Sequence, residues 1–259
     1  MNKRKLLIAI SGFIITSHSL FAHDHINLER GIPVMLEDAY PTAYMNREIQ
    51  GYTRYERTSS NEDNFVVTPV LEYGFIRNGE LELEVPTRFG EEKDQESGNL
   101  NFGGLYNFFY EGLYMPAPAI AAQVSVPTGA NTSGTDTRLG FLLTKTLSRS
   151  TYFHRIHFNA YWHNNDKPES SERVNYYEFA LGYQMRVNPN NQLLINILQQ
   201  QQQKKDMEAA TVIEVGIRHQ WNPLWILAAG VGAGVSHDAP DMIATIGFQK
   251  AMNFFWDSP

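Results

Sequence analysis

The chain has 259 residues, 21 basic and 28 acidic side chains, a formal net charge of −7 at pH 7, 42% hydrophobic residues and no cysteine. The negative balance argues against a nucleic-acid-binding protein, which needs a basic surface, and the lack of cysteine excludes disulfide frameworks, zinc–thiolate sites and cysteine nucleophiles. A mean hydropathy of −0.36 excludes a helical membrane protein, which needs runs of about 20 apolar residues.

The first 22 residues have the pattern of a secretory signal peptide. Lys3, Arg4 and Lys5 form a positive start, an apolar stretch covers residues 6–15, and Ala22 ends the segment with a small residue suited to cleavage. An apolar stretch of this length is too short to span about 30 Å of hydrocarbon as a helix. We therefore expect an exported protein with a cleaved leader.

Residues 23–47 carry few strand signals and are predicted to form an N-terminal periplasmic segment or a plug. Cleavage after Ala22 would place His23, Asp24 and His25 at the new N-terminus, where an amine and an imidazole can hold Cu²⁺ or Ni²⁺ in square-planar geometry. Such residues more commonly belong to a polar, disordered N-terminus than to a metal site. We therefore assign no metal and no cofactor.

From residue 48 onward, blocks of about ten residues alternate between apolar and polar positions, as strands do. No linker or internal duplication divides residues 48–259, so we expect one domain. The twelve predicted strands cover residues 48–56, 64–75, 81–89, 100–110, 118–126, 137–147, 152–163, 174–187, 192–199, 210–221, 225–235 and 242–255.

The connections between these blocks alternate in length. In an up-and-down meander, all odd connections lie at one end of the sheet and all even ones at the other. The odd connections are long and polar (residues 57–63, 90–99, 127–136, 164–173, 200–209 and 236–241), and the even ones are mostly tight turns (77–79, 111–116, 148–150, 188–191 and 222–223). Short turns at one rim and longer loops at the other are typical of outer-membrane barrels.

The faces of the predicted strands differ in character. In residues 210–221, for example, Ile213, Val215 and Ile217 alternate with the polar Glu214 and Arg218. We expect the apolar face to contact lipid and the polar face to line a lumen, where the charged side chains are candidates for selectivity rather than catalysis. These lumen candidates are Glu82, Glu84, Arg88, Arg138, Arg155, His157, Glu178, Arg186, Glu214 and Arg218.

A soluble β-sandwich would show the same alternation, and three further features favour the membrane. A membrane sheet must close to satisfy its backbone, which fits an even strand count. The chain is predicted to be exported. Aromatic side chains lie near block ends, where interfacial girdles form: Tyr52, Tyr55, Phe89, Tyr110, Tyr152, Trp162, Trp221, Trp225, Phe254 and Phe255. The predicted fold is an all-β, up-and-down antiparallel transmembrane barrel of about 12 strands.

One residue is at odds with this assignment. Lys250 shares the outward parity of Ile246 and Phe248 in the last block, so either its amine reaches an interface or the register slips there.

Two stretches resemble a family of Gram-negative outer-membrane barrels, the MetA-pathway phenol-degradation family, whose members are commonly described as transporters. Residues 31–40 (GIPVMLEDAY) are similar to the segment before the family's first strand. Residues 116–129 (PAPAIAAQVSVPTG) are similar to its strand that runs from a Pro-Ala pair into a Pro-Thr-Gly turn. The resemblance implies a location and a fold, and no catalytic residues. Outer-membrane barrels commonly end on an aromatic residue, whereas this chain continues to Asp257, Ser258 and Pro259.

A search for catalytic groups finds one candidate pair. His157 and Asn159 share a face and would suit a Ser-His-Asn hydrolase acting on lipid, but Ser148, Ser170 and Ser171 lie in loops or turns outside any recognisable motif. Lining of the barrel interior is the simpler role for the pair. Among the lumen charges, we expect Arg155 to meet Glu178 and Glu214 to meet Arg218.

The sequence thus predicts a passive outer-membrane channel, not an enzyme, with no cofactor. It would admit small molecules, including aromatic or hydrophobic ones. Its expected partners are outer-membrane lipid, the solute and the assembly machinery, and no nucleic acid. The alternatives are a lipid-acting outer-membrane hydrolase and a structural or adhesive barrel that binds partners through its outer loops.

Overall fold

The computed structural model describes residues 27–58, 62–90, 97–148, 150 and 152–252. The predicted signal peptide and the residues after Met252, including Phe254 and Phe255, lie outside this part. Within it, no helix is long and apolar enough to cross a membrane.

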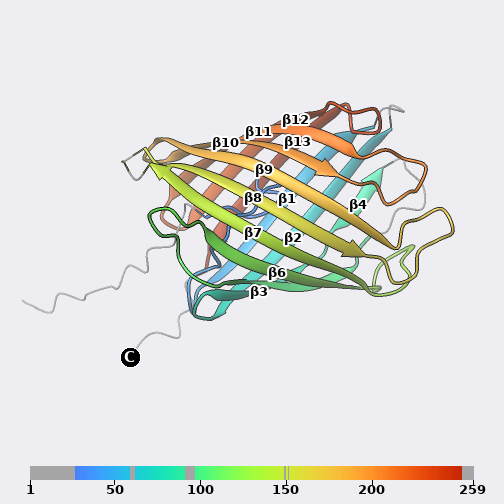
Figure 1. The fold of residues 1–259 in the computed structure, drawn as a ribbon, viewed down its shortest axis with the longest axis horizontal. Coiled ribbons are helices and arrows are strands. Elements are labelled where there is room, and N and C mark those ends of the chain that lie inside the picture. The colour runs from blue at the N-terminus through green and yellow to red at the C-terminus, as the bar shows by residue number, and fades with distance from the viewer. Residues whose placement is uncertain (1–26, 59–61, 91–96, 149, 151, 253–259) are drawn as a thin grey trace, which may run out of the picture.

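The described residues form one antiparallel sheet that closes into a barrel (Figure 1). Apart from β3 and β4, which both pair with β2, each strand pairs with its neighbours in sequence. β1 pairs with both β2 and β13, which closes the cylinder. The strands are β1 (Arg47–Arg57), β2 (Asp63–Ile76), β3 (Gly79–Glu84), β4 (Thr87–Gly90), β5 (Leu100–Asn107), β6 (Ala117–Val126), β7 (Asp136–Ser148), β8 (His154–Asn164), β9 (Asn175–Asn188), β10 (Asn191–Gln200), β11 (Ala210–Asn222), β12 (Trp225–Gly234) and β13 (Met242–Ala251).

The third predicted strand, residues 81–89, is divided in the structure. Both β3 and β4 pair with β2, so the two follow one another along a single barrel strand. Val85 and Pro86 separate them, and a proline has no N–H to donate to a neighbouring strand. Counting β3 and β4 as one gives twelve barrel strands, as the alternation predicts.

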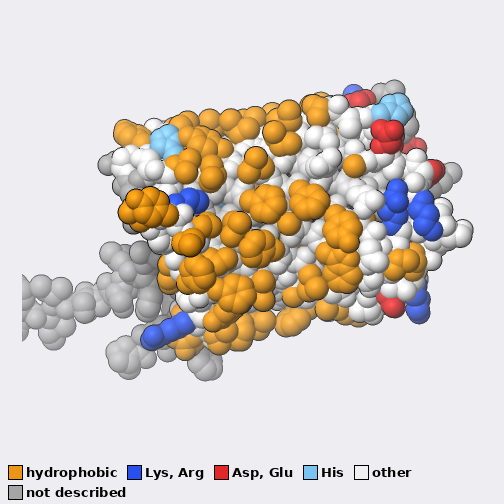
Figure 2. Space-filling view, in the orientation of Figure 1, with side chains coloured by type: hydrophobic (Ala, Val, Ile, Leu, Met, Phe, Trp, Pro, Cys, Tyr) orange, Lys and Arg blue, Asp and Glu red, His pale blue; other side chains and the backbone are white. Residues whose placement is uncertain are grey.

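The outer surface carries a broad apolar belt (Figure 2). In β11, Ile213, Val215 and Ile217 are exposed, while Glu214 and Arg218 on the other face are each 1% exposed. A soluble sandwich would bury its apolar face instead. Charged side chains gather at the rim that carries the longer loops, on the right of Figure 2. By analogy with outer-membrane barrels, that rim faces outward and the short-turn rim faces the periplasm.

Two rim positions clarify the sequence pattern. Lys250 faces outward in unbroken register with β12, and its amine lies 4.8 Å from the centroid of the Trp225 ring, at the short-turn end. The register therefore does not slip. Tyr52 was expected in an aromatic girdle, and this is wrong: it points into the barrel and lines its cavity, because it shares parity with Gln50 and Arg54.

Residues 27–46 run inside the barrel rather than beside it. Leu28, Val34 and Leu36 pack against lumen-facing apolar side chains of β9, β10, β11 and β13. Ala39 packs against Leu105 and other small or apolar residues of β5, β6 and β7. The apolar clusters of buried side chains therefore lie within the lumen, between the N-terminal segment and the wall.

Two lumen-facing glycines make room for this segment. A Cβ at Gly182 would lie 2.1 Å from Cδ2 of Leu36, and a Cβ at Gly216 would lie 2.3 Å from Cγ of Pro33. Glycine in a strand commonly marks the close approach of another part of the chain. Here the approaching part is the N-terminal segment.

Candidate functional site in the barrel lumen

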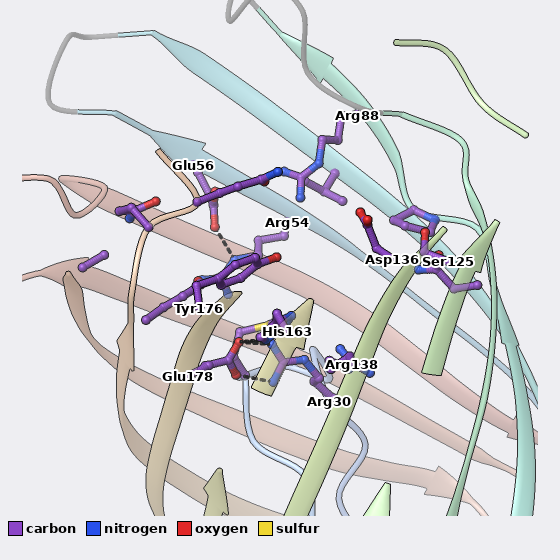
Figure 3. Close-up of a pocket in the computed structure, with 18 of the residues that line it drawn as sticks. Arg30, Arg54, Glu56, Arg88, Ser125, Asp136, Arg138, His163, Tyr176 and Glu178 are labelled. Carbon is purple, nitrogen blue, oxygen red and sulfur yellow. Dashed lines mark hydrogen bonds and ion pairs between the residues drawn. The ribbon is translucent and has the colours of Figure 1, made fainter. Parts of the chain in front are cut away.

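Arg30 carries a positive charge from the N-terminal segment to the barrel wall. Its two terminal nitrogens donate to both carboxylate oxygens of Glu178 in β9, at 2.6 and 2.8 Å. The Arg30 guanidinium also lies 4.9 Å from the centroid of the Tyr161 ring. His163 contacts the same carboxylate, with Nε2 3.7 Å from Oε2 of Glu178. Figure 3 shows Arg30, His163 and Glu178 converging beside Arg138.

Two further contacts hold the segment against β8. The Tyr161 hydroxyl donates to Oε2 of Glu37 at 2.5 Å. The side chain of Asn159 bonds both the backbone N–H of Glu37, at 2.9 Å, and its carbonyl oxygen, at 2.8 Å. Because the Asn159 amide bonds both backbone groups of Glu37, it fixes the orientation of the backbone there, as pairing with a neighbouring strand would.

A third anchor lies on β11. Glu214 accepts a hydrogen bond from the backbone N–H of Met35 at 2.9 Å and another from Asn196 at 3.0 Å. Its other oxygen pairs with Arg54 of β1 at 2.5 Å. The Glu214 carboxylate is therefore shared between the wall and the N-terminal segment.

A cavity of about 1000 Å³ lies above this segment and extends to the longer loops. Its basic lining residues are Arg30, Arg54, Arg88, Arg138 and Lys204, and its acidic ones are Glu29, Glu37, Glu56, Glu62, Glu72, Glu82, Glu84, Asp136, Glu169, Glu172, Glu178 and Asp238. Acidic groups therefore predominate. Toward the short-turn rim the lumen is filled: His157, Gln184 and Gln249 are each at most 1% exposed.

Half of the predicted lumen candidates line this cavity: Glu82, Glu84, Arg88, Arg138 and Glu178. They come from β3, β4, β7 and β9. Arg138 stacks on Tyr161 at 5.2 Å from the ring centroid, and Arg88 stands at the mouth of the cavity (Figure 3).

The remaining candidates lie deeper or at the rim. Arg155 pairs with Asp38 of the segment at 3.7 Å, Arg218 donates to the carbonyl oxygen of Asn27, and Glu214 holds Met35 as described. His157 is buried in the wall. Arg186 donates to the carbonyl oxygen of Pro189 in a short turn at 2.7 Å and lies apart from the others.

The expected charge pairs within the wall are wrong. The register places Arg155 opposite Gln184, and Glu178 opposite Tyr161, so Arg155 and Glu178 lie far apart along the barrel. Glu214 pairs with Arg54, and Arg218 bonds Gln249 and Asn27 rather than Glu214. The partners come largely from the N-terminal segment or from distant strands, which the parity of a single strand does not reveal.

The hydrolase constellation is not assembled. The two ring nitrogens of His157 face Oγ1 of Thr144 at 3.1 Å and Oε1 of Gln184 at 3.2 Å. Asn159 bonds the backbone of Glu37 instead of orienting the histidine. The loop serines 170 and 171 lie at the far rim. A serine nucleophile needs a histidine within hydrogen-bond reach, and among the described residues no serine is hydrogen-bonded to His157.

Several lumen residues were missed by the sequence analysis. Arg54 has the parity of Gln50 in β1, and this signal could have identified it. Arg30 and Asp38 lie in a segment without periodicity, so only the fold shows that they face the wall charges Glu178 and Arg155.

A family model described as "Putative MetA-pathway of phenol degradation" matches residues 48–250. The chain belongs to this family. The match spans β1 to β13, and residues 27–46, which fill the lumen, precede it. The resemblance in the sequence is thereby confirmed. Among curated proteins, no significant relative is found by sequence.

Solved structures share the fold at low sequence identity. The COG4313 outer membrane channel from Pseudomonas putida F1 is 13% identical with a TM-score of 0.63, over 87% of this chain and 100% of that one. The KdgM porin in complex with disordered oligogalacturonate is 9% identical with a TM-score of 0.57, over 80% and 99%. The NanC porin is 8% identical with a TM-score of 0.55, over 80% and 100%.

These matches agree with the closed sheet and the apolar belt. The predicted fold is confirmed: the chain is a closed antiparallel β-barrel with the fold of these outer-membrane channels and porins.

Proposed function

We propose that this protein is a passive outer-membrane channel for small molecules, held closed in this structure by residues 27–46, which we call the plug. The observation that carries the proposal is a cavity that reaches the outer loops and ends on this segment inside a closed barrel. The fold is shared with channels and porins. Opening of the channel would require the plug to break at least some of its contacts with the barrel wall.

We propose further that the protein is not an enzyme. The compared structures are channels and porins, and the His157 and Asn159 side chains are engaged in structural contacts. A serine-directed probe tests this: specific labelling that a His157→Ala variant loses would favour the lipid-acting hydrolase.

The solute is a separate part of the proposal. The family description favours small aromatic molecules, whereas the lining of the cavity is rich in charged side chains. Polar, charged solutes therefore fit this cavity better than apolar ones.

The membrane contacts complete the proposal. The apolar belt would contact outer-membrane lipid, and the exported chain would be inserted by the assembly machinery. The predicted leader and the C-terminal residues that this machinery would read lie outside the described part of the chain.

The decisive experiment locks the plug to the wall. The natural chain has no cysteine, and Cγ of Leu36 lies 3.0 Å from the place of a Cβ at position 182, which suits the short separation of a disulfide. We expect the Leu36→Cys/Gly182→Cys variant to be silent in planar bilayers when oxidised and to conduct after reduction. Each single cysteine variant is the control.

Two results would count against the proposal. Equal conductance of the oxidised and reduced double variant, with the disulfide verified by thiol labelling, would show that the plug does not close the pore. A folded wild-type protein that never conducts would favour the structural or adhesive barrel.

A further inference from the structure

One side of the cavity is lined by carboxylates from β3 and from the plug. Glu82 and Glu84 project from β3, and Glu29 projects from the plug. Within the described part of the chain, none of the three makes an ion pair. On the opposite side of the cavity, Glu178 pairs with Arg30.

The strand register explains why these charges are crowded. Glu82 lies opposite Glu72 of β2, and Glu72 lies opposite Glu48 of β1. Like charges directly opposite one another destabilise a sheet. Glu72 and Glu48 accept hydrogen bonds from uncharged donors, Gln50 for both. Glu82, in contrast, faces Gly103 on its other side, so the neighbouring strand offers it no side chain.

An uncharged side chain gives independent evidence of a missing ligand. Asn101 of β5 is 7% exposed and lies opposite Glu84. Its Nδ2 donates to Oε1 of Glu84 at 2.7 Å, and Gln123 donates to the same oxygen at 2.7 Å. The other atom of this amide, Oδ1, is buried without a hydrogen-bond partner. A buried acceptor without a donor costs free energy.

The chemistry that satisfies this site is a positively charged N–H donor. An ammonium group has three donors and no acceptor, and the site offers the carboxylates of Glu82 and Glu84 and the Asn101 carbonyl. Among the described residues, no group of three or more His, Asp or Glu side chains is arranged to hold a metal ion. An organic cation therefore fits better than a coordinated metal.

We propose that Glu82, Glu84 and Asn101 bind the protonated amine of a small solute that enters from the outer loops. The proposal rests on the channel function above and names the class of solute. Among the described residues, Arg138 is a cation that lines the same cavity. It stacks on Tyr161 at 5.2 Å, belongs to β7, three strands away from β3, and makes no ion pair with these acids.

The test is a titration of the folded full-length protein in detergent with butane-1,4-diammonium chloride, followed by calorimetry at low salt. We expect Glu82→Gln to weaken binding by about tenfold, the effect of losing a charged hydrogen-bond partner. The matched control is Glu169→Gln, which removes a charge from the same cavity at an outer loop and should leave the affinity unchanged.

Glu82→Asp supplies a second variant that keeps the negative charge. It should bind the diammonium ion more tightly than Glu82→Gln, because it retains the charged hydrogen-bond partner. Acetate should not compete with the amine, and MgCl₂ should compete no better than NaCl of equal ionic strength. Equal losses in Glu82→Gln and Glu169→Gln, or stronger competition by Mg²⁺, would overturn the proposal, as would a wild-type protein that does not bind the diammonium ion.

The amine-binding hypothesis and the channel hypothesis can be tested independently. Binding in detergent does not require an open pore, whereas the disulfide experiment measures conductance without any amine. Conductance without diammonium binding would refute the amine site alone, and binding to a silent barrel would refute the channel alone.

Discussion

The ion pair between Arg30 and Glu178 is a buried contact between the plug and the wall. The side chain of Glu178 is fully buried and that of Arg30 is 14% exposed. Removing one member of a buried pair leaves an unpaired charge, which costs about 3–5 kcal/mol. Since the pair forms only when the plug is seated, its loss should favour the unseated state.

We therefore predict that Arg30→Gln increases the open fraction in planar bilayers and lowers the free energy of unfolding by about 3 kcal/mol or more. The control is Arg57→Gln at the exposed pair with Asp63, where both side chains are more than 40% exposed and the expected change is about 0–1 kcal/mol. Similar effects of the two substitutions would mean that the Arg30 pair does not hold the plug. Denaturant unfolding and single-channel recording supply the two readouts.

At the level of single residues, the sequence predicts which wall side chains face inward but not what they contact. Alternation identified Glu178 and Arg155 as lumen residues, and both lie there. Their partners, Arg30 and Asp38, belong to a segment whose sequence has no period that would place it against a particular strand. The proposed amine site depends on Gly103, which leaves no side chain opposite Glu82, and on the register of β3 against β5. The sequence of a single strand reveals neither feature.

The plug fits the barrel because the wall strands lack side chains where it approaches. A methyl group at position 216 would lie 2.3 Å from Cγ of Pro33 and 3.2 Å from Cγ1 of Val34. Overpacking of this kind costs about 1–3 kcal/mol, and the least costly relief is movement of the plug.

We predict that Gly216→Ala increases channel opening by about tenfold, which corresponds to roughly 1.4 kcal/mol. Gly51→Ala is a matched control: its new methyl group would meet the outward-facing Phe248 ring at 3.3 Å and would not touch the plug. An unchanged open probability in Gly216→Ala, or an equal rise in both variants, would contradict the assigned role of the plug.

The connection between β5 and β6 differs from the other short-turn connections. It exposes Leu113, Tyr114 and Met115, and it is tied to β7 through Glu111. This carboxylate accepts a hydrogen bond from the backbone N–H of Thr146 at 2.7 Å and pairs with Lys145 at 3.4 Å. Burial acts to raise the pKa of Glu111, but these hydrogen bonds and the Lys145 charge outweigh it and lower the pKa from its ordinary value.

A lowered pKa means that the Glu111 contacts stabilise the fold above the ordinary pKa of glutamate, about 4.3, and that this contribution is lost as pH falls through the lowered value. We predict that the backbone amide resonance of Thr146 titrates with a midpoint below about 4.3, and that Glu111→Gln removes this transition. A midpoint above that value would show that the carboxylate is not stabilised in its charged form.

The apolar belt makes the whole barrel sensitive to charge in a depth-dependent way. Leu181 lies midway along β9 and is 58% exposed, whereas Trp221 lies near the short-turn end of β11 and is 69% exposed. If both face lipid, an arginine should cost about 2–4 kcal/mol at the first position and about 0–1 kcal/mol at the second.

We predict that Leu181→Arg lowers the free energy of unfolding in lipid bilayers far more than Trp221→Arg does. The two unfolded chains should not differ, because neither arginine then lies in hydrocarbon. Reversible unfolding in vesicles, with heat-dependent gel migration to confirm the barrel, measures both variants. Equal costs at the two positions would mean that the belt does not lie across hydrocarbon as assigned.

The architecture as a whole was predictable from the sequence because it repeats. The alternation of apolar and polar residues, the even number of strands and the contrast between long and short connections all follow from one closed sheet. The predicted strand bounds agree with the observed ones to within a few residues. The break at Pro86 was not predicted, since residues 81–89 keep their alternation across it. The path of residues 27–46 was not predictable in detail either, because it follows from complementary packing rather than from any local pattern.

The seam between β1 and β13 joins the first and last strands next to the segment that occupies the lumen. Because residues 27–46 lead directly into β1, the occupant of the lumen is covalently continuous with the wall at this seam. Under the proposed function, the plug can therefore leave its contacts without being lost from the protein.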